Sequence, residues 1–383
     1  MDTSPETPGT ISADDSRLFR RAVELGRRGW GRVHPNPLVG CVLVRNDEVI
    51  GEGWHREFGG PHAEVMALEN AGQLAKGSTA YVSFEPCRHY GKTAPCVDAL
   101  SKAGVRRVVF GASDPGEVSG GGGARLRGLG IQVEGPVLSS REARRENPGF
   151  FLDDGERPWL ALKLAMSLDG KISAAPGLRT RISSPESDTE VQRLRAGFDA
   201  ILVGSNTARI DDPLLTVRGD YVPRVVPLRV LLDAEGKVRP ESRVLEPGGG
   251  LVIFLTTGAS TSRWRDEIQA RGGSVIEVDS GQAGGVSLSA ALEALRLKGT
   301  RTILCEGGGV LGSGLLREGL VDRLHLILAP TLVGTGGVAA FPWPAPLGSL
   351  NAACPDGLRD WELIDEPRRI GKDTWITLEP GGA

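Results

Sequence analysis

The chain has little of what marks a secreted or membrane-spanning protein. Its first 15 residues, MDTSPETPGTISADD, are polar and acidic, so we expect no signal peptide. No apolar run approaches the roughly 18 residues of a membrane helix. Cysteine is scarce, with 5 in 383 residues, and the number is odd and without the spacing of a disulfide scaffold. We therefore expect a cytoplasmic protein with reduced thiols, in which paired cysteines hold a metal.

Aromatic residues are also scarce, and positive charge is not in excess. Aromatic side chains make up 5% of the sequence, and the formal net charge is −3 at pH 7. A nucleic-acid-binding surface needs basic side chains for the phosphates and aromatic ones for the bases. We therefore expect no nucleic acid and no membrane among the partners.

Strand and helix patterns alternate along the chain, and the alternation stops and restarts once. The stretch NPGFFLDDGERPW mixes turn residues with charges, which is typical of a domain junction, and we place the junction at residues 147–158. The sequence therefore predicts two α/β domains, residues 15–148 and residues 156–383, and the first is expected to have α/β/α layers.

The first domain is expected to follow a disordered start of about 14 residues with a helix over DDSRLFRRAVELGRRGWG, capped by Asp14 or Asp15. Its other expected elements are two strands around Asn46-Asp47, a helix over 62–75, a strand over 78–86, a helix over 96–104 and a strand over 105–115. In the second domain the patterns predict strands over 158–170, 199–207, 224–233, 251–257, 300–309, 321–334 and 371–380, and helices over 187–198 and 287–299. We expect the last two strands to be antiparallel.

A histidine and two cysteines stand at positions suited to a catalytic zinc, which takes three protein ligands and leaves a fourth place for water. His62 begins an expected helix, Cys87 follows a strand, and Cys96 begins another helix, where the dipole favours a thiolate. The ends of three elements can converge on one point, so these are the candidate ligands. The remaining cysteines, Cys41, Cys305 and Cys354, are expected to be small buried apolar residues.

Glu64 lies two residues after His62, in the first turn of the expected helix. From there its carboxylate can face the water without binding the metal, take a proton and pass it to leaving ammonia. The order His-x-Glu, then Pro86-Cys87, matches the first parts of the zinc-deaminase signature, but the second cysteine follows nine positions later instead of three. The set predicts a hydrolytic deaminase.

Several stretches of this domain resemble a known family. NPLVGCVLV, GWHREFGGPHAEVMAL, FEPCRHYGKTAPC and AGVRRVVFGASDP are similar to the bifunctional riboflavin-biosynthesis deaminase/reductase, whose domain is of the cytidine-deaminase type. The long separation of Cys87 and Cys96 belongs to the resemblance and distinguishes it from cytidine and transfer-RNA deaminases. The resemblance implies zinc on His62, Cys87 and Cys96, with Glu64 as the proton shuttle. The implied substrate is a diaminopyrimidinone with a ribosylamino 5′-phosphate, with Asn36 on the base and His55, His89, Lys92 and Thr93 near the ribose phosphate.

The second domain has no G-x-G-x-x-G after its first strand, so it lacks the dinucleotide fingerprint of a Rossmann fold. It has instead ILCEGGGVLGSGLL, a strand that runs into glycines and an expected helix. Backbone N–H groups before a helix N-terminus can hold a phosphate. On its own, this pattern is weak evidence in so glycine-rich a chain.

LKLAMSLDGKIS, LRAGFDAILVGSNTARIDDPLLTVR and LCEGGG, in this order, resemble the reductase half of the same family. The resemblance implies a dihydrofolate-reductase-like α/β domain that uses NADPH to reduce the ribosyl chain to a ribityl chain. The implied cofactor-binding residues are Ala165, Thr207, Asp211 and the glycines Gly308, Gly309 and Gly312. The implied substrate-binding residues are Arg195, Leu215, Arg218 and Glu306, and Asp211 or Lys163 is the candidate acid.

One stretch departs from the family pattern. LRTRISSPES puts Arg179 where a small substrate-contacting residue is expected, and Arg181 where an aromatic residue packs near the cofactor. We expect Arg179 to contact the substrate and Arg181 the cofactor.

Two other functions compete with a two-step enzyme. In the first, only the deaminase works, and the second half is a degenerate reductase that serves as an oligomerisation module. The second is a polynucleotide-editing deaminase, which the low aromatic content and the negative net charge disfavour. For the two-step enzyme, we expect a homo-oligomer formed through the reductase domain.

Overall fold

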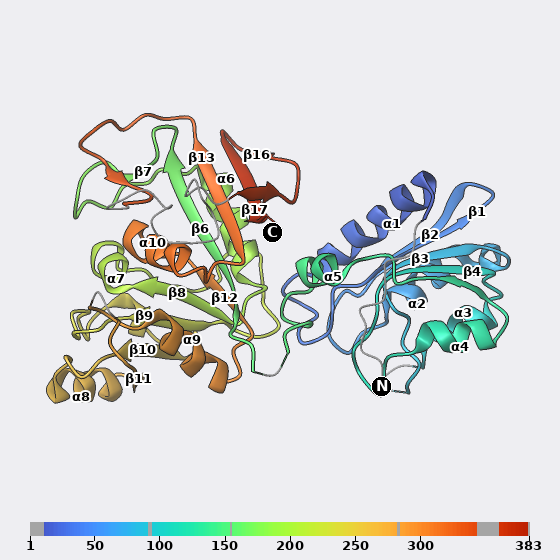
Figure 1. Ribbon diagram of the computed structural model, residues 1–383, viewed down its shortest axis with the longest axis horizontal. Helices are drawn as coiled ribbons and strands as arrows, with labels where there is room; N and C mark the ends of the chain where they lie inside the picture. Colours follow the sequence, from blue (N-terminus) through green and yellow to red (C-terminus); the bar gives the residue numbers. More distant parts are fainter. Residues whose placement is uncertain (1–10, 91–93, 154, 282–283, 343–359, 382–383) are drawn as a thin grey trace. The chain divides into compact units, whose positions relative to one another are not determined.

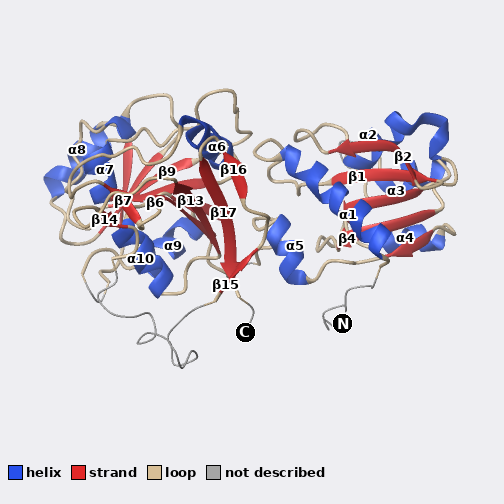
Figure 2. Cartoon of the chain, turned by 90° about the horizontal axis from the view of Figure 1, so that it is seen from above, coloured by secondary structure: helices blue, strands red, loops and turns tan. Residues whose placement is uncertain are grey.

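The computed structural model describes residues 11–90, 94–153, 155–281, 284–342 and 360–381. The chain forms two compact units, residues 1–154 and residues 155–383 (Figure 1). Both units combine helices with β-sheet (Figure 2), which confirms the predicted α/β fold class. None of the described helices combines the length and the apolar character that crossing a bilayer requires.

A five-stranded sheet forms the centre of the first unit, in the order β2-β1-β3-β4-β5. Its strands are β1 (Gly40–Arg45), β2 (Glu48–Trp54), β3 (Thr79–Phe84), β4 (Arg107–Ala112) and β5 (Gln132–Glu134). β1 is antiparallel to β2 and β3, whereas β3, β4 and β5 run parallel. Asn46 and Asp47 both have positive φ, as a tight hairpin turn requires, and so join β1 to β2 where the sequence predicts the turn.

Helices cover both faces of this sheet because successive strand residues point to opposite faces and both sets are apolar. Cys41 and Leu43 of β1 pack among residues of α2 (Ala63–Ala71), α3 (Cys96–Lys102) and α4 (Gly122–Gly128). Val42 and Val44 face the opposite way, toward α1 (Ala13–Gly26). α5 (Ser140–Glu146) packs at the ends of β3 and β4, and short 3-10 turns, Arg27–Gly29 and Gly72–Ala75, follow α1 and α2. The expected α/β/α layers result.

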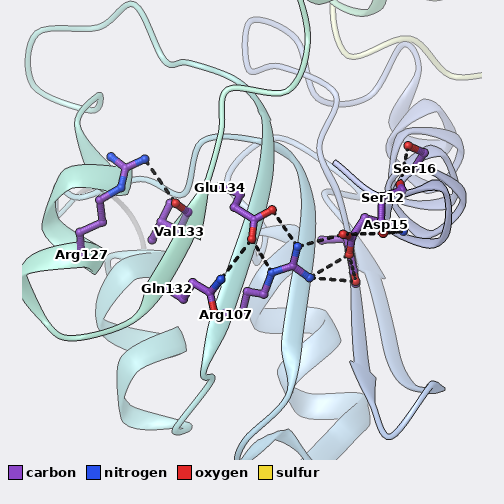
Figure 3. A network of polar contacts seen from close by, with 9 residues as sticks. Ser12, Asp15, Ser16, Arg107, Arg127, Gln132, Val133 and Glu134 are labelled. Atoms are coloured by element: carbon purple, nitrogen blue, oxygen red, sulfur yellow. Dashed lines mark hydrogen bonds and ion pairs between the residues drawn. The ribbon is translucent and has the colours of Figure 1, made fainter. Parts of the chain in front are cut away.

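The predicted cap of α1 is wrong. Ser12, not Asp14 or Asp15, is the N-cap, and its hydroxyl accepts the backbone N–H of Asp15 at 3.1 Å. The Asp15 side chain instead accepts hydrogen bonds from Arg107 at 2.8 Å and from the hydroxyl of Tyr81 at 2.6 Å. Arg107 also pairs with Glu134 at 2.8 Å, so one guanidinium joins α1 to β4 and β5 (Figure 3).

The second unit contains a ten-stranded sheet in the order β11-β10-β9-β8-β12-β6-β13-β17-β15, with β16 paired to β17. Its strands are β6 (Trp159–Ser167), β8 (Ala200–Gly204), β9 (Leu228–Leu232), β10 (Val252–Thr256), β11 (Gly273–Glu277), β12 (Thr302–Cys305), β13 (Arg323–Ala329), β15 (Trp361–Leu363), β16 (Arg368–Ile370) and β17 (Asp373–Pro380). A separate pair joins β7 (Lys171–Ser173) and β14 (Val338–Ala339). The helical segments are α6 (Pro185–Arg195), α7 (Ser205–Asp211), α8 (Ser262–Ala270), α9 (Leu288–Leu297), α10 (Gly309–Arg317) and a 3-10 turn, Arg243–Leu245.

The chain order of the parallel strands creates a crevice at one edge of this sheet. After β6, the chain passes through β8, β9, β10 and β11 and then returns to place β12 between β8 and β6. Ligands of α/β sheets bind outside the carboxyl ends of the strands at such a reversal of strand order. α7 follows β8, and the glycine run and α10 follow β12, so both arrive at this crevice.

The prediction that the last two strands are antiparallel is confirmed for β13 and β17. β13 is also parallel to β6, because the chain returns from α10 to the same end of the sheet. One expected strand is too long. The strand expected over 199–207 ends at Gly204, and Thr207 lies in helix α7.

The predicted disorder before residue 15 falls mostly on residues 1–10, outside the described chain, and α1 already begins at Ala13. Cys41 and Cys305 are buried as predicted, and Cys354 lies outside the described residues.

Candidate functional sites

The three predicted zinc ligands come together in the first unit. Nδ1 of His62 lies 3.3 Å from Sγ of Cys96 and 3.5 Å from Sγ of Cys87. Bonds of about 2.0–2.3 Å to one tetrahedral zinc place the donor atoms roughly 3.3–3.8 Å apart. The spacing and the N, S, S donor set therefore fit a zinc ion with one place left open. In the described chain, no other group of three or more potential ligands lies so close together.

The ends of three elements position these donors. His62 is the N-cap of α2, Cys87 follows β3 by three residues, and Cys96 is the first residue of α3. The backbone N–H of Cys96 points at Sγ of Cys87 at 3.4 Å. A hydrogen bond from Cys96, with others from His62 and this N–H, lowers the pKa of Cys87 to about 4. The same hydrogen bond raises the pKa of Cys96, so the site favours one thiolate, that of Cys87.

Glu64 is buried beside this cluster, with 3% of its surface exposed. Burial raises the pKa of its carboxyl group, and the positive charge of His62 acts in the opposite direction. Proton shuttles are most effective when their pKa lies near the working pH. Glu64 lines the same cavity as the cluster without being one of its three donors.

This cavity has a volume of about 290 Å³, enough for one heterocycle. The predicted substrate residues Asn36, His55 and His89 line it, whereas Lys92 and Thr93 lie outside the described residues. Nδ1 of His55 is 3.0 Å from the carbonyl oxygen of Pro61, which can only accept, so Nδ1 carries the proton. Nε2 then accepts from the amide of Asn36 at 3.1 Å, which leaves the Asn36 oxygen as an acceptor.

Sequence reasoning missed several residues of this cavity. Glu85, Asp114 and Ser119 add polar groups, and Phe84 and Phe150 pack edge-to-face at its side. Phe150 lies in the stretch predicted to be a domain junction, residues 147–158, and belongs to the first unit, because the two units divide within that stretch, between residues 154 and 155. Two features of the sequence could have identified Glu85: its position before Pro86-Cys87 and the glycine run at 120–123. No local sequence pattern identifies the other four residues.

A larger cleft, of about 1870 Å³, opens in the second unit at the crevice described above. The predicted cofactor residues Ala165, Thr207, Asp211, Gly308 and Gly309 line it. The hydroxyl of Thr207 accepts the backbone N–H of Gly308 at 3.0 Å, which ties α7 to the start of α10. Gly312 is not among the lining residues; it faces Leu162 and Leu164 of β6 inside the sheet–helix interface.

The predicted substrate residues of this unit do not all reach the cleft. Arg179 and Glu306 line it. Arg195 lies behind Glu306 and binds both of its carboxylate oxygens, at 2.5 and 3.1 Å. Arg218 is exposed, and its pKa is lowered by partial burial and by the charge of Arg195. Leu215 has a positive φ of 52° and is buried in the core with Ala208 and Phe254, so its side chain anchors the loop.

Other groups in the cleft carry charge. The amine of Lys163 lies 3.9 Å from Glu306, and burial raises the pKa of Asp211, which Arg179 and Lys163 oppose. Arg181 also lines the cleft, but its guanidinium is half exposed and pairs with Asp188 at 2.5 Å. This pair holds the Arg181 side chain against α6.

Comparisons with known proteins match each of the two units to a family. Residues 12–112 match the cytidine and deoxycytidylate deaminase zinc-binding region, and residues 158–350 match the RibD C-terminal domain. The riboflavin biosynthesis protein RibD of Escherichia coli (strain K12) is 39% identical over 84% of this chain and 89% of its own length. The same protein of Aquifex aeolicus (strain VF5) is 38% identical over 84% and 88%.

Two solved structures are similar over nearly the whole chain. Acinetobacter baumannii RibD aligns with a TM-score of 0.73 at 34% identity, covering 96% of this chain and 99% of that one. A diaminohydroxyphosphoribosylaminopyrimidine deaminase/5-amino-6-(5-phosphoribosylamino)uracil reductase from Thermotoga maritima aligns with a TM-score of 0.72 at 30% identity and the same coverage.

The folds, the zinc-type cluster and these matches define a class of enzyme in which one chain joins a zinc-binding deaminase unit to a reductase unit. The chain belongs to the RibD family of riboflavin biosynthesis proteins. It is a deaminase and a reductase, as the sequence predicts, and a reductase half reduced to a scaffold is not favoured.

Proposed function

We propose that the first unit removes an amino group from 2,5-diamino-6-ribosylamino-4(3H)-pyrimidinone 5′-phosphate by hydrolysis, with zinc on His62, Cys87 and Cys96. The observation that carries the proposal is Nδ1 of His62 at 3.3 and 3.5 Å from the two thiol sulfurs, with all three donor atoms within 4.8 Å of one another and a buried carboxylate in the same small cavity. A zinc ion in this site supplies a Lewis acid that activates water for attack.

The side chains of the chain itself do the rest. Glu64 takes the proton from the attacking water and delivers it to the amino group, which leaves as ammonia. Its burial, which raises the pKa of the carboxyl group, favours this exchange. The oxygen of Asn36, fixed by His55, accepts a hydrogen bond from an N–H group of the base. The cavity walls exclude bulk water from the reacting carbon.

For the second unit, we propose reduction of the deaminated product by NADPH, which supplies a hydride to C1′ of the ribose and leaves a ribityl chain. Gly307, Gly308 and Gly309 expose backbone at the N-terminus of the nine-residue helix α10, and this end of the helix faces the cleft. A Cβ at Gly309 would lie 2.7 Å from the backbone oxygens of Ala339 and Ala340, so glycine is required there, whereas one at Gly307 would meet only the side chain of Leu311. Such an end suits a nucleotide phosphate.

The groups around Glu306 fit the substrate in this proposal. Arg179, Arg218 and Lys163 are cations at or near the cleft and suit a phosphate. Asp211 is the proposed acid for the ring oxygen, because burial raises its pKa and so favours the protonated form. In this part of the proposal, Thr207 holds the glycine run in place, and Leu215 positions the loop that carries Arg218.

Ammonia release by the wild type and Glu64→Gln tests the deaminase. We expect one zinc per chain in both, and a loss of release of at least about a hundredfold in the variant. Loss of the metal in Glu64→Gln would identify the glutamate as a ligand and overturn the assigned roles.

The reductase is tested by NADPH oxidation with the deaminated substrate. Residues 155–383 alone are expected to oxidise NADPH, and residues 1–154 alone to release ammonia, because each residue set forms a compact unit.

Sedimentation of the two pieces tests the proposed homo-oligomer, which the second piece should form and the first should not. If residues 155–383 bind NADPH but do not oxidise it with the deaminated substrate, the second unit has a scaffold role instead.

A further inference from the structure

Glu85 is a buried carboxylate in the wall of the zinc cavity that the proposed deamination does not use. It is 8% exposed, lies between β3 and Cys87, and lines the cavity. Among the described residues, its carboxylate forms no ion pair within 4.0 Å. A buried carboxylate needs compensation, and here backbone N–H groups supply it.

Three N–H groups of one segment point at this carboxylate. Oε2 accepts from Asp114 at 3.1 Å and from Gly121 at 3.3 Å, and Oε1 accepts from Gly123 at 2.8 Å. We name residues 113–123 the wall loop. Hydrogen bonds to an ionised acceptor are the strong kind, so one side chain fixes both ends of the wall loop.

The wall loop is part of the cavity and also touches the zinc-ligand turn. Asp114 and Ser119 line the cavity. The backbone N–H of Arg88, next to Cys87, donates to the carbonyl of Ser119 at 3.3 Å. Gly122 lies so close to the carbonyl oxygen of Pro86 that any Cβ there would overlap it. The loop therefore lies directly against the turn that carries Cys87.

We propose that Glu85 is a positioning residue for substrate binding: it fixes the wall loop so that Asp114 and Ser119 meet the substrate in a preformed site. This inference rests on the proposed deaminase function and adds a residue to it. Pre-organised walls lower the cost of binding, and small displacements of such groups are expensive in rate. Loss of the Glu85 contacts should therefore raise KM and leave kcat nearly unchanged, because the wall loop holds no metal ligand and no proton shuttle.

Glu85→Gln tests this with a nearly isosteric change. An amide has one acceptor oxygen, so at least one of the three N–H groups then faces an NH₂ group. We expect kcat/KM for ammonia release to fall about ten- to a hundredfold through KM, with kcat within about threefold of wild type and one zinc per chain. Glu85→Asp keeps the charge and is expected to recover part of the KM.

A second variant acts on the same contact from the other side. Gly122→Ala forces the wall loop away from Pro86 and is expected to raise KM as Glu85→Gln does. Gly128→Ala, in the same helix α4, is the matched control, because a Cβ there meets nothing within 4 Å. One zinc per chain and an unchanged melting transition of the first unit report that each variant is folded in that unit.

The outcomes separate two failures. If the wild type releases no ammonia, the proposed deaminase function fails. If the wild type is active and Glu85→Gln keeps the wild-type KM, loses zinc, or loses kcat at unchanged KM, the positioning role is overturned. Elevated KM in Gly128→Ala would also count against it, because the effect would then not be specific to the wall loop.

Discussion

Arg195 and Glu306 form an ion pair behind the reductase cleft, and both side chains are about nine-tenths buried. Arg195 also donates to the carbonyl of Thr216 at 2.8 Å, so it holds the loop that leads to Arg218. Removing one partner of a buried pair leaves the other charge uncompensated. The pair therefore sets the charge and the shape of the site together.

Arg195→Met is expected to destabilise the second unit by about 3–5 kcal/mol, because Glu306 then keeps the amine of Lys163, at 3.9 Å, and the more distant charge of Arg218 in place of a direct partner. NADPH oxidation should fall with it, and ammonia release should not. Urea unfolding followed by both activities checks this. Adding Glu306→Gln removes the stranded charge and should restore part of the stability; a variant as stable as wild type would show that the pair contributes nothing.

Single residues also show what the sequence could reveal about the site. His62, Glu64, Cys87 and Cys96 are found from spacing, because two of them share one helical turn and the others open or precede elements. The positive φ of Leu215 could not be predicted from the sequence, because leucine rarely adopts this backbone conformation. Arg195 was predicted at the substrate, but its place behind Glu306 depends on how two strands and a helix meet.

At the level of elements, α1 is held on the sheet by a polar network as well as by apolar packing. Arg107 of β4 pairs with Asp15 of α1 and with Glu134 of β5 (Figure 3). The side chain of Arg107 is 15% exposed. The hydrogen bond from Arg107 is the largest cause that lowers the pKa of Asp15. Because the folded value lies below the ordinary one, Asp15 stabilises the fold above about pH 4, and this contribution is lost as the pH falls further.

Arg107→Met is expected to destabilise the first unit by about 3–5 kcal/mol, since two carboxylates lose their partner. It should also weaken the dependence of stability on pH below about pH 4, where protonation of Asp15 costs wild type more. Hydrogen exchange of α1 and β5 amides at pH 6 and pH 3.5 measures both effects. Arg125→Met, which removes an exposed pair with Asp98, is the control; equal losses in both variants would contradict the prediction.

The elements that periodicity predicts are those with long apolar faces, such as β1, β6 and α9. The patterns miss α4, whose sequence GGARLRG opens with the glycines that its close approach to Pro86 requires. They also miss α8 and β11, and the parallel pairing of β13 with β6 depends on the path between elements. Pairing partners are decided by tertiary structure, which a local pattern does not contain.

At the level of the whole molecule, the two units have separate hydrophobic cores and separate sites. The core around Leu43, Ala67 and Leu100 belongs to the first unit, and the one around Leu160, Leu202 and Ile303 to the second. Domains with their own cores can unfold as separate cooperative units. A ligand that binds one unit then stabilises that unit alone.

Removal of zinc is expected to destabilise only the first unit. The donor atoms of His62, Cys87 and Cys96 join the ends of β3, α2 and α3, so the ion links elements that packing alone joins less firmly. A loss of about 3–5 kcal/mol lowers the melting temperature of a unit of this size by roughly 10 °C. Calorimetry of the full chain with and without a chelator should show one transition that moves and one that does not. In Cys96→Ala, the first unit should melt at the lower temperature without a chelator, and adding a chelator should not lower it further. In the control Cys41→Ala, which changes a buried cysteine outside the cluster, the chelator should still lower the melting temperature. A chelator that shifts both transitions, or neither, would contradict a zinc confined to the first unit.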